Sequence, residues 1–253
     1  MTVLIIQARM GSSRLPGKVL MNVNGKSIIE NLLDRLKPAT GIDKVIVATT
    51  YLPEDDAIEF FCVKKGVECF RGSDWDVLDR FYQATISLEE KPTDVIRICC
   101  DNPMHHYKTL QTVLDAYQKS GSDYLSNSNH EPQFLEDGFD VEIFKMSALE
   151  EAWNKAALLS EREHVTPFIK NSGLFNCEWI RTNEKYHYKL SVDTLEDLRL
   201  AQAIFDSFDN DIEFGMNEVA ALLESKPELL AINKGSIINS GYAKSLREDK
   251  KIK

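Results

Sequence analysis

A loop near the start of the chain combines small residues with three cations. Glycine lets a backbone approach a ligand closely and aim its N–H groups at oxygen atoms, while Arg and Lys neutralise negative charge. These residue types, directly after the apolar run 2–6, predict a binding site for a polyphosphate. The residues concerned are Arg9, Gly11, Ser12, Ser13, Arg14, Gly17 and Lys18.

The loop approaches the P-loop pattern G-x-x-x-x-G-K-[ST] without matching it. Five residues rather than four separate Gly11 from Gly17, and Val19 stands where that pattern needs a hydroxyl for Mg²⁺. Pro16 lacks a backbone N–H, and the dinucleotide pattern G-x-G-x-x-G is absent. The remaining alternative is a basic surface loop without a ligand, which the coincidence of so many specific residue types disfavours.

Two aspartates follow predicted strands further along the chain. Asp101 comes after the run 94–99, and Asp193 comes after the run 188–192. Mg²⁺ prefers one or two carboxylates together with phosphate oxygens and water, so both side chains are candidate ligands for the Mg²⁺ that triphosphate chemistry needs. The structural alternatives are a turn residue for Asp101 and a helix cap for Asp193.

The elements that must position these side chains alternate between strand and helix through the first half. Repeated β-α-β units predict an α/β fold with a doubly wound, mostly parallel sheet, which binds ligands at the carboxyl ends of its strands. Strands are expected at 2–6, 44–49, 67–70, 94–99, 123–126, 140–144, 175–181 and 188–192. Helices are expected after the S-x-x-E pattern at 27–30, at 54–65, after 73–76, at 107–119, at 147–157, after 160–163, after Thr166, at 194–206 and at 217–224.

Length and composition indicate one main domain. With 253 residues, 43% of them hydrophobic, the chain can bury a sizeable core. We expect a domain at 1–225 with an insertion at about 127–145, where periodicity is lost. The extension 226–253 is expected to be partly mobile, because the tail from Lys244 is charged and lacks apolar periodicity.

Charge and cysteine content exclude several classes of function. The net charge of −10 argues against nucleic acid as a partner, because duplex binding depends on many Lys and Arg contacts to phosphate. No apolar run approaches the roughly 18 residues of a membrane span, and the N-terminus lacks the pattern of a signal peptide. The five cysteines contain no C-x-x-C pair, which favours reduced thiols in the cytoplasm and neither a zinc site nor a disulfide framework.

The segment QARMGSSRLPGK at 7–18 resembles the opening of a nucleotidyltransferase family. That family includes the CMP-KDO synthetases and acylneuraminate cytidylyltransferases, and the branch labelled spore-coat polysaccharide biosynthesis proteins is the most similar. The resemblance implies a Rossmann-like nucleotidyltransferase fold, a loop that binds the triphosphate of CTP, and an inserted region that helps form a homodimer. It places nucleotide contacts on Ala8, Arg9, Gly11, Ser12, Ser13, Arg14 and Lys18.

Further motifs extend the resemblance along most of the chain. Asp101-Asn102-Pro103 and the segment VDTLEDL at 192–198 match family motifs whose aspartates hold the catalytic metal, which implies Asp101 and Asp193 here. Relatives carry Thr-Gly or Gln-Gly ahead of the first aspartate, whereas this chain has Cys99-Cys100. The remaining matches imply nucleotide contacts for Arg71 and Gly72, and substrate contacts for Asp140, Glu142 and His164.

Together these observations predict a Mg²⁺-dependent cytidylyltransferase. An acceptor oxygen on a sugar or sugar acid would attack the α-phosphorus of CTP and release pyrophosphate, supplying surface-polysaccharide synthesis. Positioning and charge neutralisation by Arg9, Arg14, Lys18, Asp101 and Asp193 would provide the catalysis. Two alternatives remain, namely a glycosyltransferase of related fold that consumes a nucleotide-sugar, and a non-catalytic nucleotide-binding protein of a glycan pathway.

Overall fold

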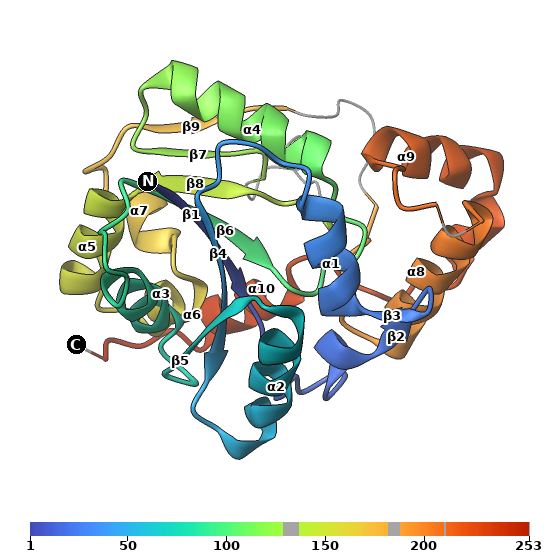
Figure 1. Cartoon of the computed structure of the whole chain (residues 1–253), viewed down its shortest axis with the longest axis horizontal. Helices are drawn as coiled ribbons and strands as arrows, with labels where there is room; N and C mark the ends of the chain where they lie inside the picture. The colour runs from blue at the N-terminus through green and yellow to red at the C-terminus, as the bar shows by residue number, and fades with distance from the viewer. Residues whose placement is uncertain (129–136, 182–187, 210, 253) are drawn as a thin grey trace.

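The computed structural model describes residues 1–128, 137–181, 188–209 and 211–252. Among these residues, seven strands form one sheet in the order β5-β4-β1-β6-β8-β7-β9 (Figure 1). The strands are β1 (Thr2–Gln7), β4 (Lys44–Thr50), β5 (Glu68–Gly72), β6 (Asp94–Cys99), β7 (Tyr124–Ser126), β8 (Glu142–Lys145) and β9 (Cys177–Trp179). A separate antiparallel pair consists of β2 (Asn22–Val23) and β3 (Lys26–Ser27).

The sheet is mostly parallel, as the sequence predicts. β1 pairs in parallel with β4 and β6, and β4 pairs in parallel with β5, whereas β8 runs antiparallel to β6 and β7. The helices are α1 (Ile28–Leu36), α2 (Asp56–Lys65), α3 (Val77–Ile86), α4 (Tyr107–Ser120), α5 (Met146–Lys155), α6 (Leu159–His164), α7 (Pro167–Asn171), α8 (Leu195–Ser207), α9 (Met216–Ser225) and α10 (Ser240–Arg247). Short 3₁₀ turns occur at η1 (Lys18–Leu20), η2 (Pro53–Asp55) and η4 (Pro227–Ala231). The α/β class is therefore confirmed.

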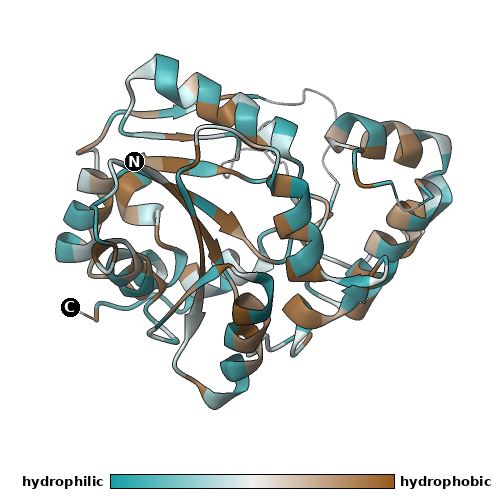
Figure 2. Ribbon diagram, viewed as in Figure 1, coloured by the Kyte–Doolittle hydropathy of each residue, from teal (hydrophilic) through white to brown (hydrophobic). Residues whose placement is uncertain are grey.

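Both faces of the sheet are buried because the central strands are apolar on both sides. In β1, Leu4 and Ile6 pack in one core cluster with residues of α1, α2 and α4, while Val3 and Ile5 pack in a second cluster with residues of α3 and α5. Successive side chains of a strand point to opposite faces, so a continuous apolar run must be covered on both sides. Figure 2 shows the hydrophobic residues concentrated on the central strands.

A third cluster lies at one edge of the molecule. Residues of α8 and α9 pack there against Val23 of β2 and Ile28 of α1. The helix starts follow the sequence at several places, including α1, where Ser27 Oγ accepts the backbone N–H of Glu30 at 3.3 Å. Among the described residues, no helix is both long and apolar enough to cross a membrane.

The expected strand at 188–192 does not form. Asp137 Oδ2 accepts the backbone N–H groups of Leu190 and Ser191, each at 2.7 Å, so a carboxylate takes the donors that a neighbouring strand would use. The segment still lies beside the sheet, because the backbone N–H of Val192 donates to the carbonyl of Asp101 at 2.8 Å. Asp193 therefore lies beside the sheet edge as predicted, although the predicted strand before it does not form.

The helix start predicted at Ser160–Glu163 is also displaced. α6 begins at Leu159, and the carboxylate of Glu161 accepts the backbone N–H groups of Ala157 and Leu158 at 2.8 and 3.0 Å. The hydroxyl of Ser160 is inside the helix and donates to Asp249 at 2.7 Å. An acidic residue two positions earlier than expected thus satisfies free donors at this helix start.

The C-terminal tail, for which the sequence predicts partial mobility, contains a helix. The chain forms α10 and then pairs with the start of α6. The backbone N–H of Leu159 donates to the carbonyl of Lys250 at 3.0 Å, and that of Ile252 donates to the carbonyl of Ala157 at 2.8 Å. These contacts join segments far apart in sequence, and a periodicity analysis of the tail alone does not reveal them.

Candidate functional site

A cavity of about 700 Å³ opens at the carboxyl ends of β1 and β6. This is where a parallel sheet binds ligands, because the loops after the strands diverge there. One wall comes from the loop after β1, and another from the end of α6 together with α10. The described residues that line the cavity are Gln7, Ala8, Arg9, Ser12, Ser13, Arg14, Lys18, Val19, Val77, Arg80, Cys99, Cys100, Asp101, Glu163, His164, Asp193, Ser240, Gly241, Lys244, Ser245, Arg247 and Glu248.

The loop after β1 is held in a defined shape by its own backbone. The carbonyl of Met10 accepts the N–H groups of Ser12 and Gly17, both at 2.8 Å. Gly17 has φ 75° and precedes η1, a left-handed conformation that favours glycine. The backbone N–H of Met10 donates to the buried carboxylate of Asp55 at 2.6 Å, which fixes the start of the loop to the segment after β4. This reversal directs Lys18 toward the sheet.

Lys18 connects the two predicted metal ligands. Its ammonium group donates to Asp101 Oδ2 at 2.8 Å, to Asp193 Oδ1 at 2.9 Å and to the carbonyl of Val192 at 2.7 Å. Because Asp101 Oδ2 and Asp193 Oδ1 both contact Lys18 Nζ, the distance between these two oxygens cannot exceed the sum of their distances to that nitrogen. Burial alone would lower the pKa of Lys18, but attraction and hydrogen bonds from Asp101 and Asp193 raise it above its ordinary value.

Asp193 is surrounded by positive charge. Its Oδ1 also pairs with Arg14 Nη2 at 2.8 Å, and its Oδ2 pairs with Lys189 at 3.1 Å. Burial raises the pKa of Asp193, but the charges of Lys18, Lys189 and Arg14 outweigh that effect and lower the pKa to about 2. Asp193 is therefore ionised at neutral pH.

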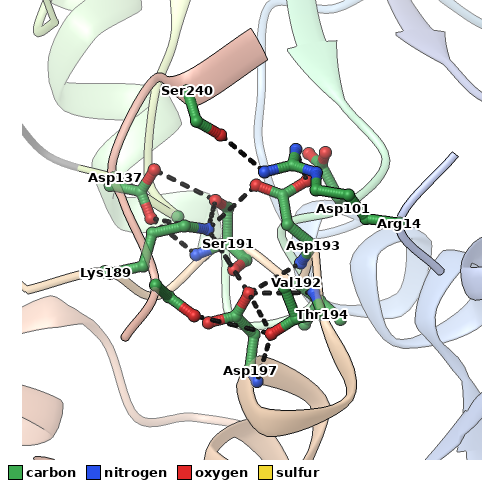
Figure 3. A network of polar contacts seen from close by, with 12 residues as sticks. Arg14, Asp101, Asp137, Lys189, Ser191, Val192, Asp193, Thr194, Asp197 and Ser240 are labelled. Carbon is green, nitrogen blue, oxygen red and sulfur yellow. Dashed lines mark hydrogen bonds and ion pairs between the residues drawn. The ribbon is translucent and has the colours of Figure 1, made fainter. Parts of the chain in front are cut away.

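Lys189 is the centre of a network behind Asp193 (Figure 3). Its ammonium group lies 3.7 Å from Asp137 Oδ2 and 3.8 Å from Asp197 Oδ2, and it donates to the carbonyl of Ser191 at 2.6 Å. Asp197 in turn caps α8 together with Thr194, as the sequence predicts. Asp193 is thus free to face the cavity because the neighbouring Thr194 and Asp197 already cap the helix. From the sequence, Lys189 is one of the cations that could turn toward the acceptor, but an isolated lysine carries no pattern that places it behind Asp193.

Two further cations complete the loop side of the cavity. Arg80, which is 2% exposed, donates to the carbonyls of Ser73 and Asp74 at 2.8 and 3.2 Å, and Arg9 donates to the same Asp74 carbonyl at 3.4 Å. Burial, and then the charge of Arg9, lowers the pKa of Arg80 to about 10, and the side chain stays charged. The sequence around Arg80 fits an exposed helix residue equally well, although its i, i+3 spacing from the apolar Val77 places it on the inward face of α3.

The predicted nucleotide contacts at Arg71 and Gly72 are not brought to this cavity. Arg71 donates to the carbonyls of Thr50 and Leu52 at 2.8 and 2.9 Å and pairs with Asp56 and Glu59 at 2.6 and 2.8 Å. These four contacts fasten β5 to the segment after β4 and to α2.

Gly72 acts through Arg80. A Cβ atom at Gly72 would lie 2.8 Å from Arg80 Cγ, so the absence of a side chain makes room for the arginine stem. Neither Arg71 nor Gly72 is among the described residues that line the cavity.

Of the other loop residues predicted to contact the nucleotide, some line the cavity and one does not. Ala8, Ser12 and Ser13 line the cavity, whereas Gly11 does not, and a Cβ at Gly11 would lie 3.0 Å from Glu54 Oε1. Cys99 and Cys100 line the cavity beside Asp101. Burial raises the pKa of Cys99 to about 12 and that of Cys100 well above its ordinary value, so both thiols are protonated and present a weakly polar surface.

The three predicted substrate contacts have different surroundings. His164 lines the cavity, and burial lowers the pKa of its imidazole to about 4, which leaves the ring neutral at physiological pH. Asp140 and Glu142 are not among the described lining residues. The carboxylate of Asp140 accepts the backbone N–H of Gly138 at 3.3 Å, and burial and then Asp137 raise its pKa to about 7.

Glu142 is the centre of a buried structural network. Its carboxylate accepts hydrogen bonds from Tyr124 at 2.7 Å and Thr166 at 2.6 Å, and it pairs with Arg97 and with Lys170 at 3.3 Å. Burial alone would raise the pKa of Glu142, but these partners hold it well below its ordinary value. Both carboxylate oxygens bond to protein groups, so Glu142 joins β6, β7, β8 and α7 and is not among the described residues that line the cavity.

The donor set of the cavity fits a divalent cation. Asp101 Oδ2 and Asp193 Oδ1 both contact the ammonium group of Lys18, so the two carboxylates can bind the same positive charge. The Asp101 side chain is 27% exposed. In the part of the chain that the structure describes, no group of three or more His, Cys, Asp or Glu side chains is gathered as a metal site. Two carboxylates completed by phosphate oxygens and water match the preference of Mg²⁺.

Comparisons with known proteins give consistent results. A family model described as Cytidylyltransferase matches residues 3–226. The chain is 30% identical over 236 residues to the spore coat polysaccharide biosynthesis protein SpsF of Bacillus subtilis, covering 88% of this chain and 94% of that protein. It is 35% identical over 130 residues to 3-deoxy-manno-octulosonate cytidylyltransferase 2 of Hydrogenovibrio crunogenus, covering 48% of this chain and 49% of that protein. A solved cytidylyltransferase from Leptospira borgpetersenii matches with a TM-score of 0.82 and 30% identity, covering 90% of this chain and 96% of that one.

Proposed function

The chain belongs to the cytidylyltransferase family, and we propose that it transfers CMP from CTP to a sugar or sugar-acid acceptor with release of pyrophosphate. The names of two relatives support this choice of acceptor and pathway. One is named for spore coat polysaccharide biosynthesis, and the other for 3-deoxy-manno-octulosonate, which is a sugar acid. The product would supply the synthesis of a surface polysaccharide.

The observation that carries the proposal is the position of Lys18. Its ammonium group lies within 2.9 Å of Asp101 and Asp193, which come from segments 92 residues apart in the chain, counted from their residue numbers. A loop that can bind a triphosphate is thereby joined to the carboxylates that can hold a divalent cation. The loop proposed to bind the triphosphate and the carboxylates proposed to hold the cation line one cavity.

The residues of this chain can perform three tasks in such a transfer. Arg9, Arg14 and Lys18 would bind the β- and γ-phosphates and stabilise the charge that grows on pyrophosphate as its bond to the α-phosphorus breaks. Arg80, fixed by two carbonyls, adds a preorganised positive charge on the same side. The chain need not supply a nucleophile, because the attacking atom is an oxygen of the acceptor.

Mg²⁺ is the cofactor we propose, held by Asp101 and Asp193. When bound, it would polarise the α-phosphate and neutralise phosphate charge. Lys189 would keep Asp193 ionised and oriented from behind, since it pairs with Oδ2 and leaves Oδ1 toward the cavity.

The proposal also includes a homodimer and a cytoplasmic location. The dimer follows from the resemblance to the family, and the location from the five cysteines, which are all free thiols.

The test is a product assay. The purified protein is incubated with Mg²⁺, each of the four nucleoside triphosphates, and a panel of sugar acids, sugar phosphates and neutral sugars, and pyrophosphate and nucleotide-sugars are measured by mass spectrometry. We expect pyrophosphate and a CMP-sugar with CTP only. Consumption of a nucleotide-sugar without pyrophosphate would instead indicate a glycosyltransferase, and binding of CTP without turnover of any acceptor would favour a non-catalytic role.

A further inference from the structure

The C-terminal segment crosses the cavity and supplies one of its walls. The family model matches the chain only as far as residue 226, whereas α10 spans Ser240–Arg247. In Figure 1 the chain runs from α9 at one edge of the molecule, through α10 near the ends of the central strands, to the C-terminus at the other edge. This wall is therefore an addition to the part of the chain that the family defines.

The segment is anchored on both sides of the cavity. Before α10, the side-chain amide of Asn233 donates to the carbonyl of Lys189 and to Asp197 Oδ1, both at 2.9 Å. Within α10, the buried hydroxyl of Ser245 donates to Glu163 at 2.8 Å and lies 2.8 Å from His164 Nε2. These contacts hold α10 in a defined position beside the end of α6.

The face that α10 turns to the cavity carries two cations. The lining residues Ser240, Lys244 and Arg247 follow the i, i+4, i+7 spacing of a single helical face. Two acidic residues, Glu163 at the end of α6 and Glu248 after α10, also line this wall. Within the described ranges of the chain, the side chains of Lys244 and Arg247 have no hydrogen-bond or ion-pair partner. The four other lining cations, Arg9, Arg14, Lys18 and Arg80, each donate to a protein oxygen.

The position of these two cations separates them from the triphosphate loop. Arg14 Nη1 donates to the hydroxyl of Ser240 at 2.6 Å, so the first residue of α10 lies beside the loop. With a rise of about 1.5 Å per residue, the backbone of Lys244 lies about 6 Å and that of Arg247 about 10 Å farther along the helix axis. The helix thus places the backbones of Lys244 and Arg247 away from Arg14, and an anion between these two side chains would lie farther along α10 than a phosphate bound by Arg14.

We propose that Lys244 and Arg247 of α10 bind an acidic group, carboxylate or phosphate, on the acceptor sugar and thereby select an anionic acceptor. This inference rests on the proposed function and adds to it the subsite that recognises the acceptor. This proposal replaces the expectation that Asp140 and Glu142 form the acceptor wall. It retains His164, whose Nε2 lies 2.8 Å from the hydroxyl of Ser245 in α10. A neutral acceptor would leave two unpaired cations in the loaded site.

The experiment uses the full-length protein and two probes. α,β-Methylene-CTP with Mg²⁺ is titrated first by calorimetry, and inorganic phosphate is then titrated into the complex saturated with this analogue. In the variant Lys244→Gln/Arg247→Gln we expect unchanged affinity for the analogue but at least about tenfold weaker binding of phosphate, because charge-assisted hydrogen bonds to an anion are lost. Glucuronate and glucose 1-phosphate, with glucose as the neutral reference, then identify which acidic group the site prefers.

Two control variants make the result specific. Lys234→Gln/Lys250→Gln removes the same charge from exposed positions of the tail outside the cavity lining and should bind phosphate like the wild type. Lys244→Arg/Arg247→Lys keeps both charges and should stay within about threefold of the wild type. Circular dichroism verifies that each variant is folded.

The possible failures are distinguishable. If the wild type does not bind the CTP analogue, the proposed function fails, and phosphate is titrated into the free protein to test α10 separately. If phosphate does not bind to the wild type, or binds equally to Lys244→Gln/Arg247→Gln, the acceptor subsite is wrong. If the variant loses affinity for the analogue instead, the two cations belong to the triphosphate site and the proposal is overturned.

Discussion

Replacing Lys18 with methionine removes the charge that joins the two aspartates while keeping a side chain of similar length. The ammonium group has three partners at 2.7–2.9 Å, and its side chain is only 10% exposed. We expect Lys18→Met to bind CTP at least about tenfold more weakly than the wild type, because a charge-assisted contact to phosphate contributes about 1.5–3 kcal/mol.

The same substitution should lower stability in a pH-dependent way. Burial raises the pKa of Asp193, but Lys18 is the strongest of the neighbouring charges that lower it from 3.8 to about 2. Since one pKa unit corresponds to about 1.4 kcal/mol, the lowered pKa contributes about 2 kcal/mol to the free energy of unfolding near neutral pH. Lys18→Met should lose about half of this, or about 1 kcal/mol.

The sign of the pH dependence follows from the lowered pKa. An acid whose pKa is lower in the folded protein adds stability above its ordinary pKa, and this stability is lost as the pH falls through the folded value. The difference in unfolding free energy between wild type and Lys18→Met should therefore be constant above about pH 5 and shrink between about pH 4 and pH 2.

The assay is urea unfolding across this pH range, together with calorimetric titration of CTP and Mg²⁺. Lys26→Met is the matched control, because Lys26 pairs with Asp34 at 2.6 Å where the two side chains are 41% and 40% exposed. Such a surface pair contributes less than about 1 kcal/mol, and its loss should not affect CTP binding. If Lys18→Met binds CTP like the wild type, or if its stability loss matches the control at every pH, the assigned role of Lys18 is refuted.

Three further predictions test other parts of the site. Asp101→Asn and Asp193→Asn should keep the fold, measured by circular dichroism, but abolish Mg²⁺-dependent release of pyrophosphate; activity near wild type in either variant would remove it from the metal site. Glu142→Gln should lower the unfolding free energy by about 3–5 kcal/mol, because buried cations lose their counter-charge, with the acceptor KM unchanged; an altered KM at wild-type stability would restore Glu142 to the substrate wall. Gly72→Ala should destabilise the protein by about 1–3 kcal/mol and weaken CTP binding, because a new Cβ would lie 2.8 Å from Arg80 Cγ and displace it; wild-type calorimetry would contradict this.

Local patterns in the sequence predicted much of the fold and the core of the site. The apolar run of β1, the cap at Ser27 and the alternation of strands with helices are properties of neighbouring residues, and the structure contains each of them. The loop cations and Asp101 were also identifiable, because residues after parallel strands meet at one sheet edge. Asp193 was identified by the same argument, although the strand expected before it does not form. Arg14, Lys18, Asp101 and Asp193 do lie together.

Predictions that depended on what a side chain contacts were less successful. Arg71 and Glu142 have residue types suited to binding a ligand, yet their partners are protein groups that sequence spacing does not reveal. By its sequence Arg80 fits an exposed helix position equally well, but the absence of a side chain at Gly72 leaves room for the arginine stem, and Arg80 lines the cavity. In each case a contact with a residue on another helix or strand determines whether the charged side chain is paired within the protein or can bind a ligand.

The sequence by itself determined the class of fold and identified the cationic loop and the pair of acidic residues, because these depend on local periodicity and on residue types near strand ends. Only the tertiary structure decided which charges are neutralised within the protein and which remain directed at the cavity. It also placed α10, more than 220 residues after the loop by residue number, beside Arg14 through Ser240. The physical reason is that burial and pairing of a charge depend on neighbours in space, and the chain order does not specify those neighbours.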